Sequence, residues 1–453
     1  MFDDTIAAVA TALGESGLSL IRLSGREAAL IADRMFRSPS AASILPSAVP
    51  SHTVHFGWIV RKEKIVDEVL LTVMRAPRTF TREDVVEITC HGGILVAKLI
   101  LDTALENGAR LALPGEFTRR AFLNGRIDLA QAEAVADVIH ARTELALEAA
   151  NLQLAGKLSQ QINRLREDLI TILAHVEAHI DFPDEDIAPD AETHLVSKLE
   201  TTLEWLDRLL QTAGEGQLLR KGIRAAIIGE PNAGKSSLLN QLLGHERAIV
   251  SAKPGTTRDT IEETANIRGV PVVFIDTAGL RDPVDEIERE GVRRSLEAAK
   301  HAELILYVVD ASVPQPATRP IPENPPGRKR IFIRNKIDLP LRCELPPGIP
   351  QVDVSCRTGF GIDKLRDTIK ALVWAGGVGG DMLEVMINSR HENALRRARV
   401  GIENSIVGFR DGLAIELIAV DLHIAVNALG EIVGKTCTED LLDAIFKEFC
   451  LGK

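Results

Sequence analysis

Apolar and polar positions follow three patterns along the chain, which change near residues 118, 219 and 373. In residues 1–118, short apolar runs typical of strands are mixed with one helical repeat at 92–107. Strands are predicted at 5–10, 18–23, 53–60, 68–73 and 84–89. Because strands and helix do not alternate regularly, we expect an α+β domain here.

Long helices are predicted after residue 118. One helix has an apolar stripe with spacings of three and four residues, formed by Ile162, Leu165, Leu169, Ile172 and Val176. Pro183, inside the acidic cluster 181–186, ends this helix, and a second helix is predicted over 191–214. The pattern is helical again after residue 381.

Residues 220–373 interrupt the helical pattern with apolar strands that each end at a polar loop, as in an α/β domain. The simplest interpretation is one all-α helical domain in two parts, 119–219 and 374–453, with the α/β domain inserted between them. The glycine-rich stretch 375–380 is then a hinge. The alternative, in which 374–453 forms a separate domain, stays open.

A phosphate-binding loop lies at the start of the inserted domain. Gly229–Ser236 has the sequence GEPNAGKS, a GxxxxGKS motif between an apolar strand and a predicted helix. Glycines let backbone N–H groups surround phosphate oxygens, Lys235 reaches the outer phosphates, and the Ser236 hydroxyl holds Mg²⁺. The predicted nucleotide contacts in this loop are Asn232, Ala233, Gly234, Lys235, Ser236 and Ser237.

Two later loops predict that the base is guanine. Asn335-Lys336-Ile337-Asp338 ends an apolar strand. The Asp338 carboxylate can accept two hydrogen bonds from N1 and N2 of guanine, a donor pair that adenine lacks. Three residues after the next strand are expected to close over guanine O6 with backbone N–H groups: Ser355, Cys356 and Arg357.

The segments between these motifs supply the expected metal and γ-phosphate contacts. Thr257 is predicted as the second hydroxyl ligand of Mg²⁺. The motif Asp276-Thr277-Ala278-Gly279 ends a strand, so that Asp276 can hold the metal through water and the Gly279 N–H can contact the γ-phosphate. The ordered set of motifs predicts a P-loop GTPase domain that binds GTP with Mg²⁺.

The position after Gly279 carries no group that can orient the attacking water. Ras-type GTPases have glutamine there, whereas this chain has Leu280. One carboxylate of the acidic segment 281–291 is therefore expected to act instead. The Asn232 carbonyl oxygen can hold a monovalent cation beside the phosphates and so supply positive charge.

Composition narrows the class of protein. The 453 residues have a net charge of -11, so a large basic nucleic-acid footprint is not expected. The five cysteines form no CxxC pair, which favours reduced thiols; a zinc site at Cys90 and His91 is the less favoured alternative. Neither a signal peptide nor an apolar run near 20 residues is predicted, so we expect a cytoplasmic protein.

The chain resembles the MnmE (TrmE) family, the GTPases of bacterial tRNA wobble-uridine modification. The resemblance covers essentially the whole length. It includes the ending Cys450-Leu451-Gly452-Lys453, since Cys-x-Gly-Lys at this position is highly specific to the family. The other segments that carry it are 4–8, 21–25, 90–93, 114–118, 120–134 and 181–185.

The resemblance implies a folate site and a homodimer. In the family the N-terminal domain binds formyl-tetrahydrofolate and forms a constitutive dimer. The matching ligand positions are Arg22, Glu87, Arg126 and Lys453. Arg126 stands where other members have lysine, which keeps the charge and changes its geometry.

The resemblance also implies a K⁺-dependent reaction. The matching K⁺ ligands are Asn232 and Thr256 through side chains, with Ser251 and Lys253 through carbonyl groups, and the water-orienting carboxylate is Glu288. Members work with an FAD-containing partner, MnmG (GidA). Together they add an aminomethyl or carboxymethylaminomethyl group to C5 of the tRNA wobble uridine.

Two other functions share some of these features. A ribosome-assembly switch GTPase has the same nucleotide motifs but carries a basic RNA-binding appendage, for which this chain shows no KH-type module. A folate-dependent one-carbon transferase with a regulatory GTPase would also bind folate. The sequence does not decide whether Cys450 takes part in chemistry.

Overall fold

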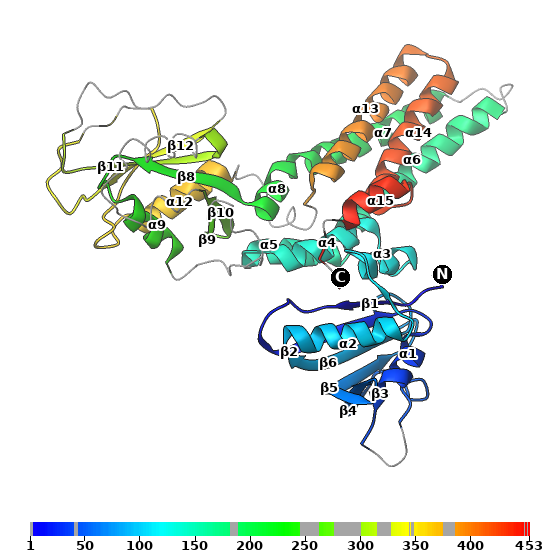
Figure 1. The fold of residues 1–453 in the computed structure, drawn as a ribbon. Helices are drawn as coiled ribbons and strands as arrows, with labels where there is room; N and C mark the ends of the chain where they lie inside the picture. The colour runs from blue at the N-terminus through cyan, green and yellow to red at the C-terminus, as the bar shows by residue number, and fades with distance from the viewer. Residues whose placement is uncertain are drawn as a thin grey trace. The chain divides into compact units, whose positions relative to one another are not determined.

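The computed structural model describes residues 3–39, 44–181, 189–244, 262–275, 300–314, 328–343, 345, 348–374, 386–447, 449–450 and 452–453. The chain divides into two compact units. Figure 1 shows the helices and strands of both, coloured along the chain. The first unit is Met1–Ala136 with Asn427–Lys453, and the second is Asp137–Val426.

A seven-stranded sheet forms the centre of the first unit, in the order β3-β4-β5-β6-β2-β1-β7. Its pairs are antiparallel except for β1 and β7, which are parallel. The strands are β1 (Ile6–Val9), β2 (Ser16–Ser24), β3 (Phe36–Arg37), β4 (Thr53–Arg61), β5 (Lys64–Met74), β6 (Val85–Gly92) and β7 (Arg110–Leu111). The five predicted strands are confirmed; the short β3 and β7 were not predicted.

One face of this sheet is covered by two helices, α1 (Ala28–Met35) and α2 (Ile94–Glu106). The predicted helix at 92–107 is thus confirmed as α2. Ile31 and Ile100 belong to the same buried cluster as Ile21, Leu71 and Ile88 of the strands. Because side chains alternate along a strand, the intervening residues point to the other face. There Val54, Phe56 and Leu70 are exposed.

The last residues of the chain complete the first unit. Helix α15 (Glu439–Phe446) packs near α3 (Glu116–Leu123) and the start of α4 (Leu129–His140). A buried cluster joins Leu129 and Ala132 to Leu442, Phe446 and Phe449. The amide of Gly115 also donates a hydrogen bond to the Cys450 carbonyl (3.4 Å).

The second unit contains long helices. They are α5 (Glu144–Leu154), α6 (Lys157–Asp181), α7 (Pro189–Gln211), α8 (Ala213–Lys221), α13 (Ser389–Asp411) and α14 (Ile415–Val433), the last of which continues into the first unit. The predicted stripe of α6, from Ile162 to Val176, is buried. The prediction of one helix over 191–214 is wrong at its C-terminal end, because α7 ends at Gln211 and a second helix begins at Ala213. Thr212 separates α7 from α8, and its hydroxyl donates to the Leu209 carbonyl (2.8 Å).

The inserted part of the second unit is a six-stranded sheet in the order β13-β12-β11-β8-β10-β9, parallel except for β9. The strands are β8 (Ile223–Gly229), β9 (Glu263–Ile267), β10 (Val270–Phe274), β11 (Leu304–Asp310), β12 (Lys329–Asn335) and β13 (Gln351–Asp353). Helices α9 (Lys235–Leu243) and α12 (Ile362–Val373) share its apolar cluster.

The predicted fold class is confirmed: an α+β N-terminal part, an all-α part and an inserted α/β P-loop part. The domain boundaries at 118, 219 and 373 stay predictions. Within the described residues, no helix combines the length and the apolar character needed to cross a bilayer.

Candidate functional sites

Three of the predicted nucleotide motifs, those that follow β8, β12 and β13, meet at one edge of the inserted sheet. β8, β11, β12 and β13 are parallel neighbours, so the loops that follow them lie at the same edge. After β8 the chain forms β9 and β10, which lie on one side of β8, and then β11, which lies on its other side. A ligand site in such a sheet lies at this reversal point, beyond the carboxyl ends of the strands.

The phosphate loop leads from β8 into the first turn of α9. Gly234 has φ +93°, and a Cβ atom there would lie 2.1 Å from Asn335 Nδ2. Only glycine fits this position. The Lys235 ammonium donates to the carbonyls of Gly229 (3.1 Å) and Glu230 (2.8 Å), while burial lowers its pKa. A phosphate group would offset the cost of burying this charge.

Asn335 connects the phosphate loop with the loop predicted to contact the base. Its Nδ2 donates to the Ala233 carbonyl (2.9 Å), and its Oδ1 accepts from the Cys356 amide (3.1 Å). Asn335 is buried, at 2% exposure, so both bonds are protected from water. One side chain therefore fixes the two loops relative to each other.

Asp338 and Ser355 lie together, as expected for a guanine site. The Ser355 hydroxyl donates to Asp338 Oδ1 (2.8 Å), which orients the carboxylate. Cys356 is partly buried, and burial raises the pKa of its thiol to about 11, so the thiol is neutral at pH 7. Arg357 is exposed.

Two residues that position this site were missed by the sequence analysis. Asp310 forms an ion pair with Lys336 (2.6 Å), and Gln241 Nε2 donates to the Cys356 carbonyl (3.0 Å). Asp310 is the last residue of the apolar strand β11, and a carboxylate at the end of such a strand was the available signal. Nothing local marks Gln241, which lies on the helix after the phosphate loop.

Part of the predicted site lies outside the described residues. Ser236 is described, in the first turn of α9 beside Lys235, where a hydroxyl can reach a cation on the phosphates. The predicted residues that are not described are Ser251, Lys253, Thr256, Thr257, Asp276, Thr277, Ala278, Gly279 and Glu288. The complete Mg²⁺ and K⁺ ligand sets stay predictions.

Three of the four predicted folate ligands come together in the first unit. Arg22 and Glu87 are register partners on β2 and β6, and Arg22 Nε lies 2.7 Å from Glu87 Oε1. Arg22 also donates to the Gly452 carbonyl (3.4 Å), next to Lys453. Burial, and then the charge of Arg22, lower the pKa of Lys453.

The fourth, Arg126, stacks on Phe80, with its guanidinium 4.8 Å from the ring centroid. Phe80 packs against a buried cluster that contains Phe117, and Arg22 lies over the Phe117 ring (5.8 Å). The two arginines therefore border one aromatic cluster. Their charges suit the carboxylates of a folate, and Glu87 offers an acceptor for ring N–H groups.

The residues considered for zinc do not form a metal site. Cys90 is buried and contacts the Ser19 carbonyl, and burial raises its pKa to about 11. His91 points to the other face of β6 and pairs with Asp67 (2.8 Å). No metal-binding group of histidine, cysteine and carboxylate side chains occurs among the described residues.

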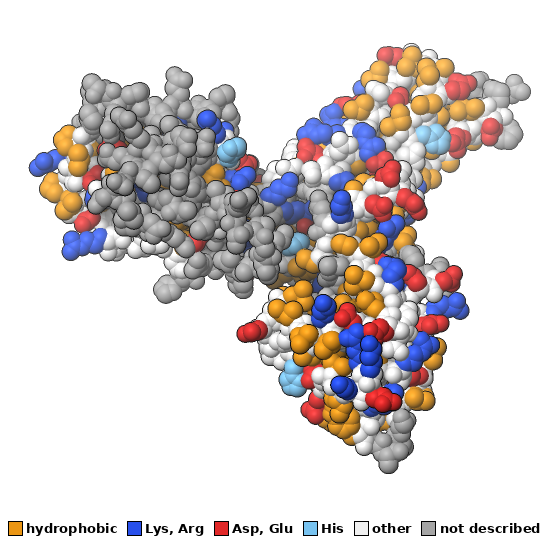
Figure 2. Space-filling model, in the orientation of Figure 1, with side chains coloured by type: hydrophobic (Ala, Val, Ile, Leu, Met, Phe, Trp, Pro, Cys, Tyr) orange, Lys and Arg blue, Asp and Glu red, His pale blue; other side chains and the backbone are white. Residues whose placement is uncertain are grey.

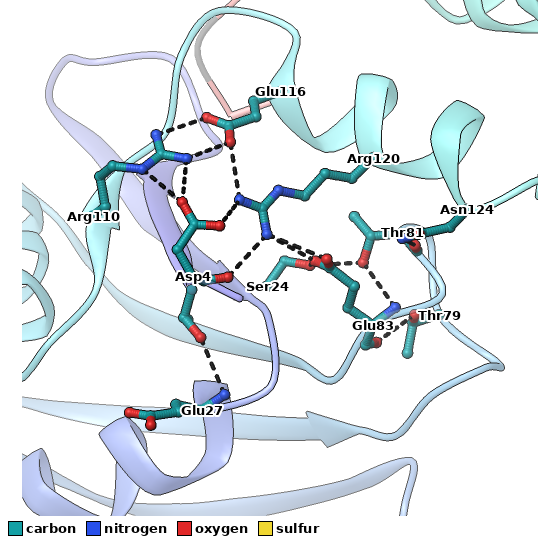
Figure 3. Close-up of polar contacts among 11 residues, drawn as sticks. Asp4, Ser24, Glu27, Thr79, Thr81, Glu83, Arg110, Glu116, Arg120 and Asn124 are labelled. Atoms are coloured by element: carbon teal, nitrogen blue, oxygen red, sulfur yellow. Dashed lines mark hydrogen bonds and ion pairs between the residues drawn. The ribbon is translucent and has the colours of Figure 1, made fainter. Parts of the chain in front are cut away.

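A buried network of ionic hydrogen bonds was also missed (Figure 3). The Arg120 side chain is fully buried on α3 and contacts carboxylates from three segments. These carboxylates are Asp4 (2.7 Å), Glu116 (3.0 Å) and Glu83 (3.2 Å). Arg110 adds bonds to Asp4 and Glu116 (both 2.6 Å). The network joins α3 to the edge of the sheet.

Comparisons with known proteins match both units. A family model described as the MnmE helical domain matches residues 129–450, and one described as GTP-binding protein TrmE N-terminus matches residues 5–126. The protein named tRNA modification GTPase MnmE of Geobacillus kaustophilus (strain HTA426) is 47% identical over 466 residues, covering 99% of both chains.

The protein of the same name in Bacillus subtilis (strain 168) is 44% identical over 460 residues, covering 99% of this chain and 100% of its own. Among solved structures, the G domain of the T. maritima FeoB iron transporter aligns with 33% of this chain and 98% of its own. The sequence identity is 25% and the TM-score 0.22.

Proposed function

Because this chain belongs to the MnmE family of tRNA modification GTPases, we propose that it hydrolyses GTP to GDP and phosphate in the course of modifying tRNA. The observation that carries the GTPase assignment is the Asn335 bridge between the phosphate loop and the Cys356 loop. This bridge supports simultaneous binding of phosphate and base. Asp338, oriented by Ser355, selects guanine.

Mg²⁺ is the expected cofactor of the reaction. Ser236 and Thr257 would hold it through hydroxyl groups, and Asp276 through water. Bound there, Mg²⁺ would neutralise the charge that develops on the β- and γ-phosphates. Lys235 contributes the second positive charge, and its ammonium is held by the carbonyls of Gly229 and Glu230 in the phosphate loop.

Hydrolysis is further proposed to need K⁺ and one carboxylate. Asn232, Ser251, Lys253 and Thr256 would hold K⁺ beside the phosphates. Glu288 would orient the attacking water, since Leu280 has no polar side-chain group. A cation in this place stabilises transition-state charge as an arginine finger does in other GTPases.

The modification itself is proposed to be addition of an aminomethyl or carboxymethylaminomethyl group to C5 of the wobble uridine. An FAD-containing partner, MnmG (GidA), would supply the flavin chemistry and much of the basic tRNA surface. The net charge of -11 supports this division of labour. On the face shown in Figure 2, basic and acidic side chains of the described residues are interspersed over both units.

The first unit is proposed to bind 5-formyl-tetrahydrofolate and to form a homodimer in the cytoplasm. The adjoining Arg22, Glu87 and Lys453 support the folate site. Exposed apolar residues on the sheet face that carries Arg22, including Phe56 and its register partner Leu70, support the dimer. A second copy could bury them.

GTP hydrolysis in K⁺ and in Na⁺ at equal ionic strength tests the catalytic part. We expect a faster single-turnover rate in K⁺, and a Glu288→Ala variant slower by about 10²-fold with unchanged GTP binding. Asp285→Ala, which removes a nearby carboxylate, should have a much smaller effect. Equal rates in both salts, or equal rates for the two variants, would refute the respective role.

Mass spectrometry of wobble uridines tests the tRNA part. In a strain that lacks this protein, the aminomethyl-type groups at C5 should disappear and return with the wild-type gene. If the deletion strain instead contains as much modified wobble uridine as the wild type, this substrate is excluded and the ribosome-assembly alternative is favoured.

A further inference from the structure

Three arginines line one pocket in the first unit. Arg78 and Arg82 lie in the segment between β5 and β6, and Arg126 lies after α3. The pocket has a volume of about 450 Å³, and Thr79 and Phe80 contribute to its wall. Two separate segments thus bring three permanent positive charges to one concave surface.

No carboxylate of the described residues pairs with these three arginines. Among the described residues, Arg78, Arg82 and Arg126 form no ion pair, whereas Arg75 nearby pairs with Asp84 (2.9 Å). Burial, and then the charge of Arg82, lower the pKa of the Arg126 guanidinium. An anion in the pocket would relieve this repulsion.

Two of the guanidinium groups are held in place by backbone carbonyls. Arg82 donates to the Asn124 carbonyl (3.0 Å), and Arg126 donates to the Phe80 carbonyl (3.0 Å) while it stacks on the Phe80 ring. A carbonyl orients the group without removing its charge. The remaining N–H donors suit carboxylates or phosphates, which arginine binds in a bidentate manner.

The pocket adjoins the proposed folate ligands. Phe80 packs against the cluster that contains Ala8 and Phe117. Ala8 is the register partner of Arg22, and the Arg22 guanidinium lies over Phe117. A molecule held at Arg22 and carrying an anionic tail would find the uncompensated charges next to it.

We propose that this pocket binds the carboxylates of the glutamate tail of a folate and favours tails of several γ-linked glutamates over one. The inference rests on the proposed folate site at Arg22 and Glu87. Each added glutamate brings one carboxylate, so three arginines match a short tail. A nucleic-acid strand would need a longer basic track than these three residues.

Calorimetric titration of the full-length protein with 5-formyl-tetrahydrofolate carrying one or five glutamates tests the proposal. We expect the pentaglutamate to bind about tenfold more tightly, as two or three exposed ion pairs would give. The ratio of the two affinities should shrink when the salt concentration rises from about 50 to about 300 mM, because salt screens exposed ion pairs.

The double variant Arg78→Gln/Arg82→Gln should lose most of this advantage, with the affinity for the pentaglutamate falling several-fold more than that for the monoglutamate, which has fewer carboxylates. Arg78→Lys, which preserves charge, should retain part of it. Arg34→Gln is the matched control, because Arg34 is exposed and donates to the Asn107 carbonyl in the same unit, outside the pocket. Equal melting temperatures would show that the variants are folded.

The outcomes separate the two proposals. If the wild type binds neither folate, both the folate site and the tail pocket are refuted. If it binds both folates equally, or if the double variant keeps the full advantage, the tail pocket alone is refuted. Binding of tRNA by the wild type and the double variant is measured in parallel. If the double variant keeps its preference for the long tail but binds tRNA more weakly than the wild type, the arginines contact RNA phosphates and the proposal is overturned.

Discussion

Asp338 illustrates how one carboxylate defines the choice of base. Two accepted hydrogen bonds from guanine require an ionised group with both oxygens directed at the base, and Ser355 holds one of these oxygens in place. Asp338→Asn replaces an acceptor by a donor. The variant should bind GTP about 10²-fold more weakly and should bind xanthosine triphosphate better than the wild type does.

Fluorescence titration with both nucleotides measures this change. Asp353→Asn is a suitable control, because Asp353 is an aspartate of the same sheet that pairs with Arg334 (2.5 Å). Its nucleotide preference should match the wild type. An Asp338→Asn protein with normal GTP affinity would remove the base assignment.

Gly234 makes a second prediction at the level of a single residue. Gly234→Ala forces a Cβ atom into the left-handed region and against Asn335 Nδ2 at 2.1 Å. The Asn335 bridge must then shift, so GTP affinity should fall by at least ~10-fold, which equilibrium titration would detect. Gly214→Ala, in a helix where nothing lies within 4 Å of the new atom, should bind GTP normally.

At the level of single residues, the sequence can nominate nucleotide contacts because they lie within short motifs of fixed spacing, and these contacts stay predictions. Asn335 ends β12 and Asp338 lies just after it, while Lys235 lies after β8. The sequence could not predict the Lys336–Asp310 pair or the Gln241–Cys356 bond. These join residues from different strands and loops, and local patterns carry no information about which partner is chosen.

Helix α3 is held to the sheet edge by charged contacts. Arg120 is fully buried, and removing it leaves Glu83 buried without its cation. Arg120→Met should lower the free energy of unfolding by about 3 kcal/mol or more. Arg119→Met is the control from the preceding position, where the pair with Asp443 is exposed and worth less than about 1 kcal/mol.

Chemical denaturation measures both variants. Adding Glu83→Gln to Arg120→Met should recover part of the loss, because the uncompensated charge is then gone. Similar effects of the two arginine variants would mean that the network contributes only packing.

The same network predicts a loss of stability in acid. Burial alone would raise the pKa of Glu116, but hydrogen bonds from Arg110, the Leu113 amide and Arg120 more than offset it, so the pKa is lowered. The pKa of Asp4 is lowered in the same way by Arg110 and Arg120. A carboxyl with a depressed folded pKa stabilises the fold above its unfolded value and loses this as pH falls.

The free energy of unfolding should therefore hold to about pH 5 and decline below about pH 4, the range of unperturbed carboxyl groups. Arg120→Met should show a shallower decline, since it lacks part of the shift. A steeper decline in the variant would contradict this origin. The network escaped the sequence analysis because its members lie at positions 4, 83, 110, 116 and 120, with no common period.

At the scale of the whole molecule, the two ends of the inserted GTPase region lie close together, and this can be tested by deleting the region. Gly216 on α8 approaches the other end of the insertion, since a Cβ atom there would lie 2.3 Å from the Ile387 carbonyl oxygen. Gln217 also contacts Glu392 (3.3 Å). Residues 222–385 should thus be replaceable by a Gly/Ser linker of about six residues, which spans roughly 20 Å.

The shortened protein should keep its helical circular dichroism and its affinity for 5-formyl-tetrahydrofolate but bind no GTP. Aggregation or loss of folate binding would show that the inserted part is needed for the rest to fold. The apolar stripe of α6 made this helix predictable from the sequence, whereas the two-part helical domain stays a prediction. The break at Thr212 was not predictable, because the helical pattern continues across it.

The joining of residues 427–453 to the first unit has a consequence for biosynthesis. The apolar residues Leu129 and Ala132 leave the ribosome 310 to 320 residues before Leu442, Phe446 and Phe449, which cover them. At roughly 5–20 residues per second, they wait about 15–60 s for their partners. During this interval the nascent chain presents an apolar surface, which makes it a natural client for ribosome-associated chaperones.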